Sequence, residues 1–401
     1  MMDKASRVRV GRPLAFFAAG FREELVGRGY AVSSAATHLV LMAQLSGWLD
    51  AAGLDLADLT AQRVDDFLCA NRAIGHRFPR SADGLTPLLA YLRRVGGVPP
   101  VSAPVRTASE DLVERFGVYL VRERGLTAGT IVGYRHAATL FLAALDDGGV
   151  DLERLTESDV NGFLVAECAR HNVAGAKNLV TGLRSLLRFF HVEGITAASL
   201  SGAVPTVAGW SGSSLPRGID SGSVKRLLGG CDRRTTKGRR DFAILMLLTR
   251  LGMRAGEVTA LELGDIDWRG GKITVRGKGN RLECLPLPVD VGNALAGYAR
   301  RGRPRNEHRE FFLRVLAPHR GLTVGAINVI VHAACDRARL PSIGTHRLRH
   351  TVASELLRRG AGLGEIGQLL RHRSIASTAI YARVDTAALS QLARPWPGGA
   401  A

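Results

Sequence analysis

The sequence predicts a mainly helical protein of two or three domains, with one small β-hairpin in its C-terminal half. A length of 401 residues and a hydrophobic fraction of 46% allow each domain its own buried core. Apolar residues recur at helical spacing in the N-terminal half. Residues 272–276 and 281–285 alternate in polarity, which is typical of two paired strands.

The N-terminal half contains an internal repeat. Residues 28–68 resemble residues 124–164 at an offset of 96. The matched segments include Arg28-Gly29 with Arg124-Gly125, Leu59-Thr60 with Leu155-Thr156, and Phe67-Leu68 with Phe163-Leu164. We therefore expect two similar helical domains, residues 1–104 and 105–200.

The C-terminal half carries almost all of the excess positive charge. A linker rich in Gly, Ser and Pro is expected at residues 201–218, followed by a basic domain at residues 219–401. The formal net charge is +18; residues 1–200 carry 22 Lys and Arg against 21 Asp and Glu, whereas residues 201–401 carry 32 against 15. The positive electrostatic field of the C-terminal half favours binding to a polyanion such as nucleic acid. On composition alone, a basic surface without a partner is an equal alternative.

Two features argue against other classes of protein. No segment approaches the roughly 18 to 20 apolar residues that cross a bilayer, and residues 1–20 lack a signal-peptide pattern. The five cysteines are widely spaced and odd in number, which argues against a disulfide framework or a structural zinc site. We expect a soluble, intracellular protein.

Arg254 and Glu257 form the first candidate site. Residues 241–251 are apolar on nearly every face, which predicts a buried helix that ends at Gly252. A second helix is expected to follow, with Arg254 and Glu257 at i and i+3 on one face. Glu257 is then placed to orient the Arg254 guanidinium, although this spacing is also common in ordinary surface pairs.

Lys278 lies in the expected hairpin turn, residues 277–280. A lysine at the tip of a hairpin is usually only solvated. This chain has 6 lysines against 48 arginines, however, so a lysine at this position is less easily dismissed as background.

A third group of candidates lies on a helix expected to be N-capped at Thr345 and to end near Gly360. His346, Arg349 and His350, at i, i+3 and i+4, share one face of it. Two histidines and an arginine together are unusual as core residues. The alternative is a basic helix that faces DNA without catalysis.

The last candidates are His372 and Tyr381. A short helix is expected to open at Ser374 and to carry Tyr381, nine residues after His372. An isolated tyrosine is normally a half-buried packing residue. Tyr381 is distinguished because it alone among the six tyrosines follows the whole basic set.

One ordered series resembles the active-site signature of the tyrosine recombinase (phage integrase) family: Arg254, Lys278, His346, Arg349, His350, His372 and Tyr381. The resemblance covers residues 219–385, and residues 108–200 are similar to that family's SAM-like core-binding domain. It implies a core-binding domain and a catalytic domain that clamp DNA. Two features depart from the family pattern: Arg371 stands where a small Gly is common, and the core-binding module is duplicated.

The resemblance implies site-specific recombination by DNA strand cleavage and rejoining, with Tyr381 as the nucleophile and a 3′-phosphotyrosine intermediate. Arg254 and Arg349 would clamp the phosphate, because a guanidinium binds phosphate with a planar fork and stays charged. Lys278 would protonate the leaving oxygen, and His372 would hydrogen-bond to the phosphate.

The residues leave open whether His346 or His350 would take the tyrosine proton. No cofactor or metal is expected, because a covalent link to the protein conserves the bond energy for rejoining. The expected partners are double-stranded DNA and further copies of this chain, in a tetramer on two DNA sites that the tail at residues 386–392 would help to assemble. Accessory proteins or partner recombinases remain open, and we expect a cytoplasmic, nucleoid-associated enzyme with no membrane contact.

Three alternatives remain. His346 and His350 match a zinc-helix spacing, with His372 as a third ligand, but the Glu expected beside the first histidine is absent and the adjacent arginines would repel the cation. The chain could instead bind DNA without cutting it, or relax DNA as a type IB topoisomerase does. The target sequence and the direction of the reaction are not encoded in any motif.

Overall fold

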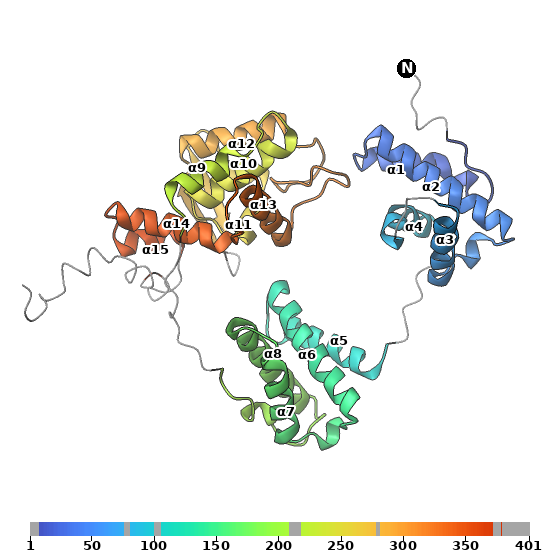
Figure 1. The fold of residues 1–401 in the computed structure, drawn as a ribbon, viewed down its shortest axis with the longest axis horizontal. Helices are drawn as coiled ribbons and strands as arrows, with labels where there is room; N and C mark the ends of the chain where they lie inside the picture. The colour runs from blue at the N-terminus through green and yellow to red at the C-terminus, as the bar shows by residue number, and fades with distance from the viewer. Residues whose placement is uncertain are drawn as a thin grey trace, which may run out of the picture. The chain divides into compact units, whose positions relative to one another are not determined.

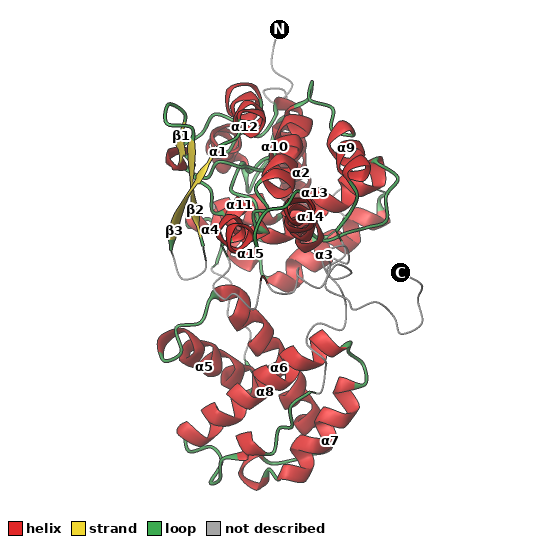
Figure 2. Ribbon diagram, turned by 90° about the vertical axis from the view of Figure 1, so that its left-hand side faces the viewer, coloured by secondary structure: helices red, strands yellow, loops and turns green. Residues whose placement is uncertain are grey.

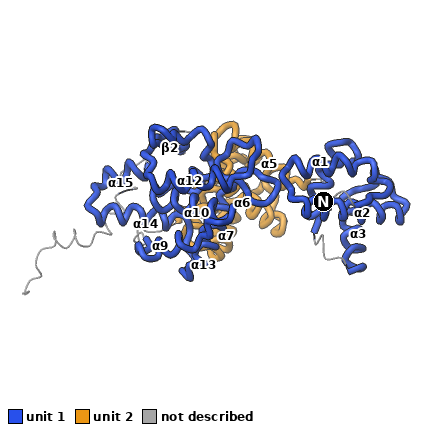
Figure 3. Tube along the Cα trace, turned by 90° about the horizontal axis from the view of Figure 1, so that it is seen from above, with its two compact units in different colours: residues 1–100, 212–401 blue, residues 101–211 orange. Residues whose placement is uncertain are grey.

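The structure is a computed structural model that describes residues 8–75, 81–99, 106–207, 218–277, 281–371 and 378. The chain divides into two compact units, one of residues 1–100 and 212–401 and one of residues 101–211 (Figures 1 and 3). Helices dominate both, as predicted, and a small antiparallel sheet lies in the C-terminal segment (Figure 2). No described helix is both long enough and apolar enough to cross a membrane.

The N-terminal segment is built from α-helices joined by short 3-10 turns. In chain order its described elements are η2 (Ala15–Phe17), α1 (Ala18–Gly27), α2 (Val32–Ala51), η3 (Leu56–Asp58), α3 (Ala61–Ala73), η4 (Ala82–Gly84) and α4 (Thr86–Arg94). Their apolar faces meet in one core that includes Leu39, Leu45 and Phe67. This segment therefore buries an apolar core made of its own residues.

The second unit is also built from α-helices and short 3-10 turns. Its elements are α5 (Ala108–Arg122), α6 (Ala128–Gly148), η5 (Leu152–Arg154), α7 (Glu157–Cys168), α8 (Val173–Val192) and η6 (Leu200–Gly202). The Thr107 and Thr156 hydroxyls accept hydrogen bonds from the N–H groups of Glu110 and Asp159, which fixes the starts of α5 and α7. The core contains Phe116, Phe141, Phe189 and Phe190.

The elements of the two segments correspond at the offset of the sequence repeat. The first residues of α2 and α6, of η3 and η5, and of α3 and α7 are each 96 positions apart. Gly53 and Gly149, which follow α2 and α6, both have a left-handed φ of 63°. Buried apolar pairs at this offset are Leu45 and Phe141, Leu49 and Leu145, Val64 and Val160, and Leu68 and Leu164. Three consecutive elements of each segment therefore correspond at the offset of the sequence repeat.

The C-terminal segment surrounds the largest core. Its helices are α9 (Ser221–Gly229), α10 (Thr236–Arg250), α11 (Ala255–Thr259), α12 (Val289–Arg301), α13 (Val324–Arg337), α14 (Thr345–Arg358) and α15 (Leu363–Leu370), with a 3-10 turn η7 (Leu263–Asp265). α10 packs against α9, α11, α12, α13 and α14, which explains why its residues are apolar on nearly every face.

The sheet has three strands in the order β1-β2-β3, namely β1 (Ile266–Asp267), β2 (Lys272–Arg276) and β3 (Leu282–Pro286). In the antiparallel β2–β3 pair, Ile273 lies opposite Leu285 and both are buried. The predicted hairpin is present, with its second strand one residue later than expected. β1 was not predicted, because a two-residue strand is too short to show alternation.

Candidate active site

The turn between α10 and α11 places Arg254 at the start of a helix. Gly252 has a φ of 57°, and a Cβ there would lie 2.7 Å from the Leu370 side chain, so both the backbone conformation and the packing favour glycine. Arg254 is the N-cap residue of α11, and its backbone N–H donates to Glu257 Oε2 at 2.8 Å. The expected i, i+3 pair therefore lies on the first turn of α11.

Glu257 is a buried carboxylate, only 4% exposed, that two arginines contact. Arg254 Nη1 donates to its Oε1 at 2.6 Å, and Arg371 Nη2 donates to its Oε2 at 2.7 Å. Burial alone raises the pKa of Glu257, but the charge of Arg371 and the hydrogen bonds outweigh burial and hold this pKa below its ordinary value. Because the Glu257 carboxylate is buried, its pair with Arg254 is not an ordinary surface ion pair.

Arg349, on α14, reaches the same place from another element. Its side chain is buried; Nη1 donates to the carbonyl of Gly252 at 2.6 Å, and Nη2 donates to the carbonyl of Leu370. Arg254 Nη2 donates to the carbonyl of the next residue, Arg371, at 3.3 Å. The two guanidiniums are thus brought together at the end of α15.

The histidines of α14 lie on the face that carries Arg349, which we call the basic face (His346, Arg349 and His350). His346 is exposed and His350 is half-buried. Burial, followed by the nearby charges of His346 and Arg349, lowers the pKa of His350. The helix itself begins one residue earlier than expected, because Gly344 rather than Thr345 is the N-cap and Thr345 is the first helical residue.

Lys278, His372 and Tyr381 lie outside the described residues, as does the tail at residues 386–392. The strands that flank Lys278 are described, and the N–H of Gly277 donates to the carbonyl of Arg281 at 2.8 Å. Within the described ranges, no three His, Cys, Asp or Glu side chains are grouped as a metal site would require. The zinc alternative also needs His372, so the described residues do not test it.

Arg371 belongs to this cluster, although the sequence singled it out only as a departure from the family pattern. It is 6% exposed and bonded to Glu257. A basic residue before His372 was visible in the sequence. Its burial against a carboxylate 114 residues earlier was not, because that contact depends on the packing of α11 against the end of α15.

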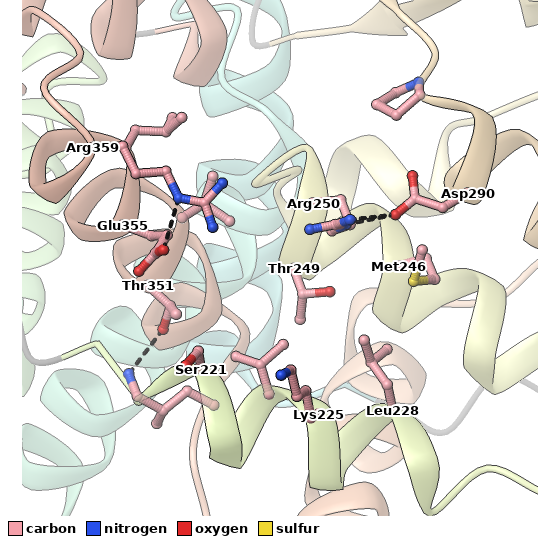
Figure 4. A pocket seen from close by; sticks show the side chains of 15 residues that line it. Ser221, Lys225, Leu228, Met246, Thr249, Arg250, Asp290, Thr351, Glu355 and Arg359 are labelled. Carbon is pink, nitrogen blue, oxygen red and sulfur yellow. Dashed lines mark hydrogen bonds and ion pairs between the residues drawn. The ribbon is translucent and has the colours of Figure 1, made fainter.

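A separate cavity of about 630 Å³ lies among residues of α9, α10 and α14 (Figure 4). Two of its cations are paired: Arg250 donates to Asp290 at 2.5 Å, and Arg359 donates to Glu355 at 2.9 Å. The α14 residues that line it lie on the side of the helix away from the basic face. None of the expected site residues lines this cavity, so we do not assign it to the active site.

Two parts of the chain, the C-terminal segment and the second unit, match models of known protein families. Residues 218–388 match the Phage integrase family, and residues 113–197 match the Phage integrase N-terminal SAM-like domain. The protein y4rA of Sinorhizobium fredii, named as an integrase/recombinase, is 42% identical over 97% of this chain and 96% of its own length. Tyrosine recombinase XerD of Listeria monocytogenes is 31% identical over 68% of this chain and 94% of its own.

Solved structures share the fold at low sequence identity. The XerH recombinase bound to its difH substrate before cleavage has a TM-score of 0.54 and 17% identity, over 86% of this chain and 99% of that one. A lambda integrase tetramer bound to a Holliday junction has a TM-score of 0.53 and 15% identity, over 77% and 87%. With relatives above 30% identity that align over most of their own length, this chain belongs to the phage integrase family of tyrosine recombinases, the enzymes of site-specific recombination that cleave and rejoin DNA strands.

Proposed function

We propose that this recombinase cleaves DNA by attack of the Tyr381 hydroxyl on a backbone phosphate. The phenolic oxygen forms a bond to phosphorus while the bond to the 5′ oxygen of the next nucleotide breaks, which leaves a 3′-phosphotyrosine and a 5′-hydroxyl. The phenol loses its proton to a base, and the departing oxygen receives one from an acid. Attack of a 5′-hydroxyl on the phosphotyrosine reverses the step, so rejoining needs no ATP.

The arrangement of Arg254 and Arg349 is the observation that supports this proposal most. Displacement at phosphorus builds negative charge on the nonbridging oxygens, and donors stabilise that charge best when they are fixed in advance. The Arg254 side chain is 37% exposed and held by Glu257, whereas Arg349 is buried and bonded to two backbone carbonyls. We assign Arg254 to direct phosphate contact and Arg349 to the buried charge that completes the clamp.

The proton transfers are assigned to residues around this clamp. Ionising a tyrosine unaided at pH 7 costs about 4 kcal/mol, because its reference pKa is near 10. We assign His346 to contact with the phenol because it is the exposed imidazole of the basic face, whereas His350 is half-buried. Lys278 is our candidate acid for the leaving oxygen, and His372 is our candidate donor to the phosphate.

The same proposal extends to assembly. We infer that residues 219–401 form the catalytic domain, that residues 105–200 form the core-binding domain, and that residues 1–104 are a second copy of the latter. Double-stranded DNA is the proposed substrate, held by a tetramer on two sites, since the lambda integrase tetramer of similar fold is bound to a Holliday junction. We place this enzyme on the nucleoid in the cytoplasm, with partner recombinases or accessory proteins as further candidates.

Recovery of DNA trapped on the protein tests this proposal. The full-length protein is incubated with sheared genomic DNA, denatured in detergent and freed of non-covalent DNA, and the attached fragments are sequenced. We expect adducts that share a recurring sequence at the junction, and none from Tyr381→Phe. Adducts of equal yield from that variant, or their absence from the wild-type protein under conditions where it binds DNA, would contradict the proposal.

A further inference from the structure

Arg371 ends α15 in a conformation that arginine rarely adopts. Its φ is 56°, in the left-handed region where glycine meets no steric penalty and other residues do. Its side chain is 2% exposed, so a group that stays charged at any ordinary pH is turned away from water. Such a residue persists only where its neighbours hold it in place.

The contacts of Arg371 lead directly to the proposed clamp. Its Nη2 donates to Glu257 Oε2 at 2.7 Å, while the other oxygen of that carboxylate accepts from Arg254 Nη1 at 2.6 Å. Its backbone carbonyl accepts from Arg254 Nη2 at 3.3 Å. Arg371 therefore holds Arg254 in two ways, through the shared carboxylate and through its own carbonyl.

Stability alone is a poor explanation for this buried pair. Removing two charges from water often costs as much as their attraction returns, and apolar residues of similar volume serve a core at least as well. Arg371 Nη1 donates to the carbonyl of Leu369 at 2.8 Å, but its buried Nε has no hydrogen-bond partner among the described residues. The ion pair of Arg371 and Glu257 is therefore better explained as fixing the orientation of the side chains around it than as adding stability.

We propose that Arg371 is a positioning residue, which fixes the Glu257 carboxylate and through it the orientation of the Arg254 guanidinium at the scissile phosphate. This inference rests on the proposed role of Arg254. It assigns a catalytic consequence to the position at which the chain departs from the glycine common in its family.

The electrostatics around Glu257 give this proposal a distinctive readout. The cations in direct contact with Glu257 are Arg254 and Arg371, and Arg349 lies beside them, bonded to the carbonyls of Gly252 and Leu370. Without Arg371, Glu257 loses the largest of the interactions that lower its pKa, so this pKa should rise. Protonated Glu257 no longer forms an ion pair with Arg254, so cleavage should then be lost as the pH falls.

The test measures single-turnover cleavage against pH, with a nicked suicide substrate built on the recovered target sequence. We expect Arg371→Met to slow cleavage about tenfold or more near pH 6 and much less near pH 8.5, while DNA affinity changes less than about threefold. Arg371→Lys, which keeps the charge without the fork, should recover part of the rate. In a Glu257→Gln background, Arg371→Met should no longer change how the cleavage rate falls at low pH, because no carboxylate titrates at position 257.

Arg240→Met is the matched control. Arg240 is also a buried arginine of the C-terminal segment, and its Nη2 donates to Asp241 at 2.8 Å; its other described hydrogen-bond partner is the carbonyl of Leu313, outside the clamp. This variant should lower the melting temperature without moving the pH profile of cleavage. Arg371→Gly is the second test variant, because glycine adopts the same φ without strain and removes only the side chain.

The outcomes separate the two proposals. A wild-type protein that forms no covalent adduct contradicts the proposed function. A wild-type protein that cleaves normally while Arg371→Met and Arg371→Gly keep its rate and pH profile contradicts the positioning role. A loss that is equal at every pH, as in a merely destabilised variant, also contradicts it. Should Arg371→Met fail to fold, Arg371→Gly decides the question alone.

Discussion

Arg349 and Arg371 of the C-terminal segment differ in burial from the paired arginines of the helical repeats. In the repeats, Arg63, Arg115 and Arg135 have side chains that are 47%, 54% and 38% exposed, and each pairs with a surface carboxylate. In the C-terminal segment, Arg349 and Arg371 are buried, and several protein acceptors hold their guanidiniums. Exposed ion pairs contribute little to stability, whereas a buried cation is destabilising unless hydrogen bonds or a counter-charge compensate it. Burial therefore distinguishes an arginine whose charge is held in a fixed place from an arginine whose charge is solvated.

Removing Arg349 should give the largest effect, because it removes the most deeply fixed charge of the clamp. We expect Arg349→Ala to lower single-turnover cleavage by about 10³-fold while DNA affinity stays within about threefold, since phosphate contacts elsewhere dominate binding. Cleavage and filter-binding assays on the same preparation measure both. Arg240→Met is the control for a lost buried arginine, and an equal loss of binding and cleavage would remove the distinction between the two arginine classes.

Lys278→Ala should come next, at about 10²-fold in cleavage, because an alkoxide leaves slowly without a proton donor. A substrate with a 5′-bridging sulfur in place of the leaving oxygen tests whether Lys278 supplies that proton. A thiolate departs without protonation, so this substrate should restore cleavage by the variant. No restoration would show that Lys278 acts in some other way than as the acid.

Arg254→Lys tests whether the clamp needs a fork or only a charge. A lysine keeps the charge but forms one contact where the guanidinium forms two, so we expect a loss of about tenfold to 10²-fold in cleavage. Because Glu257 would still pair with the lysine, folding should be retained, as a melting curve would show. Full activity would mean that charge alone suffices at this position.

Arg115→Ala, in the second repeat, should have the smallest effect. Arg115 donates to Glu193 at 2.6 Å from an exposed position, so its removal should cost less than about 1 kcal/mol of unfolding free energy and leave the cleavage step unchanged. Denaturant unfolding and the cleavage assay check both. A strong loss of cleavage would show that exposed arginines of the repeat also belong to the chemistry.

Local spacing was enough to predict the i, i+3 pair of Arg254 and Glu257, the strand Lys272–Arg276 and the shared face of His346 and Arg349. Each depends on neighbours along the chain. The repeat was also visible, because both copies bury apolar residues at equivalent positions.

What the sequence could not show was long-range burial. Arg349 bonds to a carbonyl 97 residues earlier, and Arg371 bonds to a carboxylate 114 residues earlier. Neither contact follows from periodicity, since it is set by how helices pack in the folded domain. In the sequence, Arg371 is therefore only a departure from the family pattern, and its partner Glu257 follows from the fold.

The most direct test of the account is to identify the protein atom that becomes joined to DNA. The trapped adduct would be digested with nuclease and protease, and the modified peptide would be sequenced by mass spectrometry. We predict a nucleotide phosphate on Tyr381, with the yield lowered in Arg349→Ala and absent in Tyr381→Phe. A phosphate on a serine, a histidine or a different tyrosine would contradict the proposed chemistry.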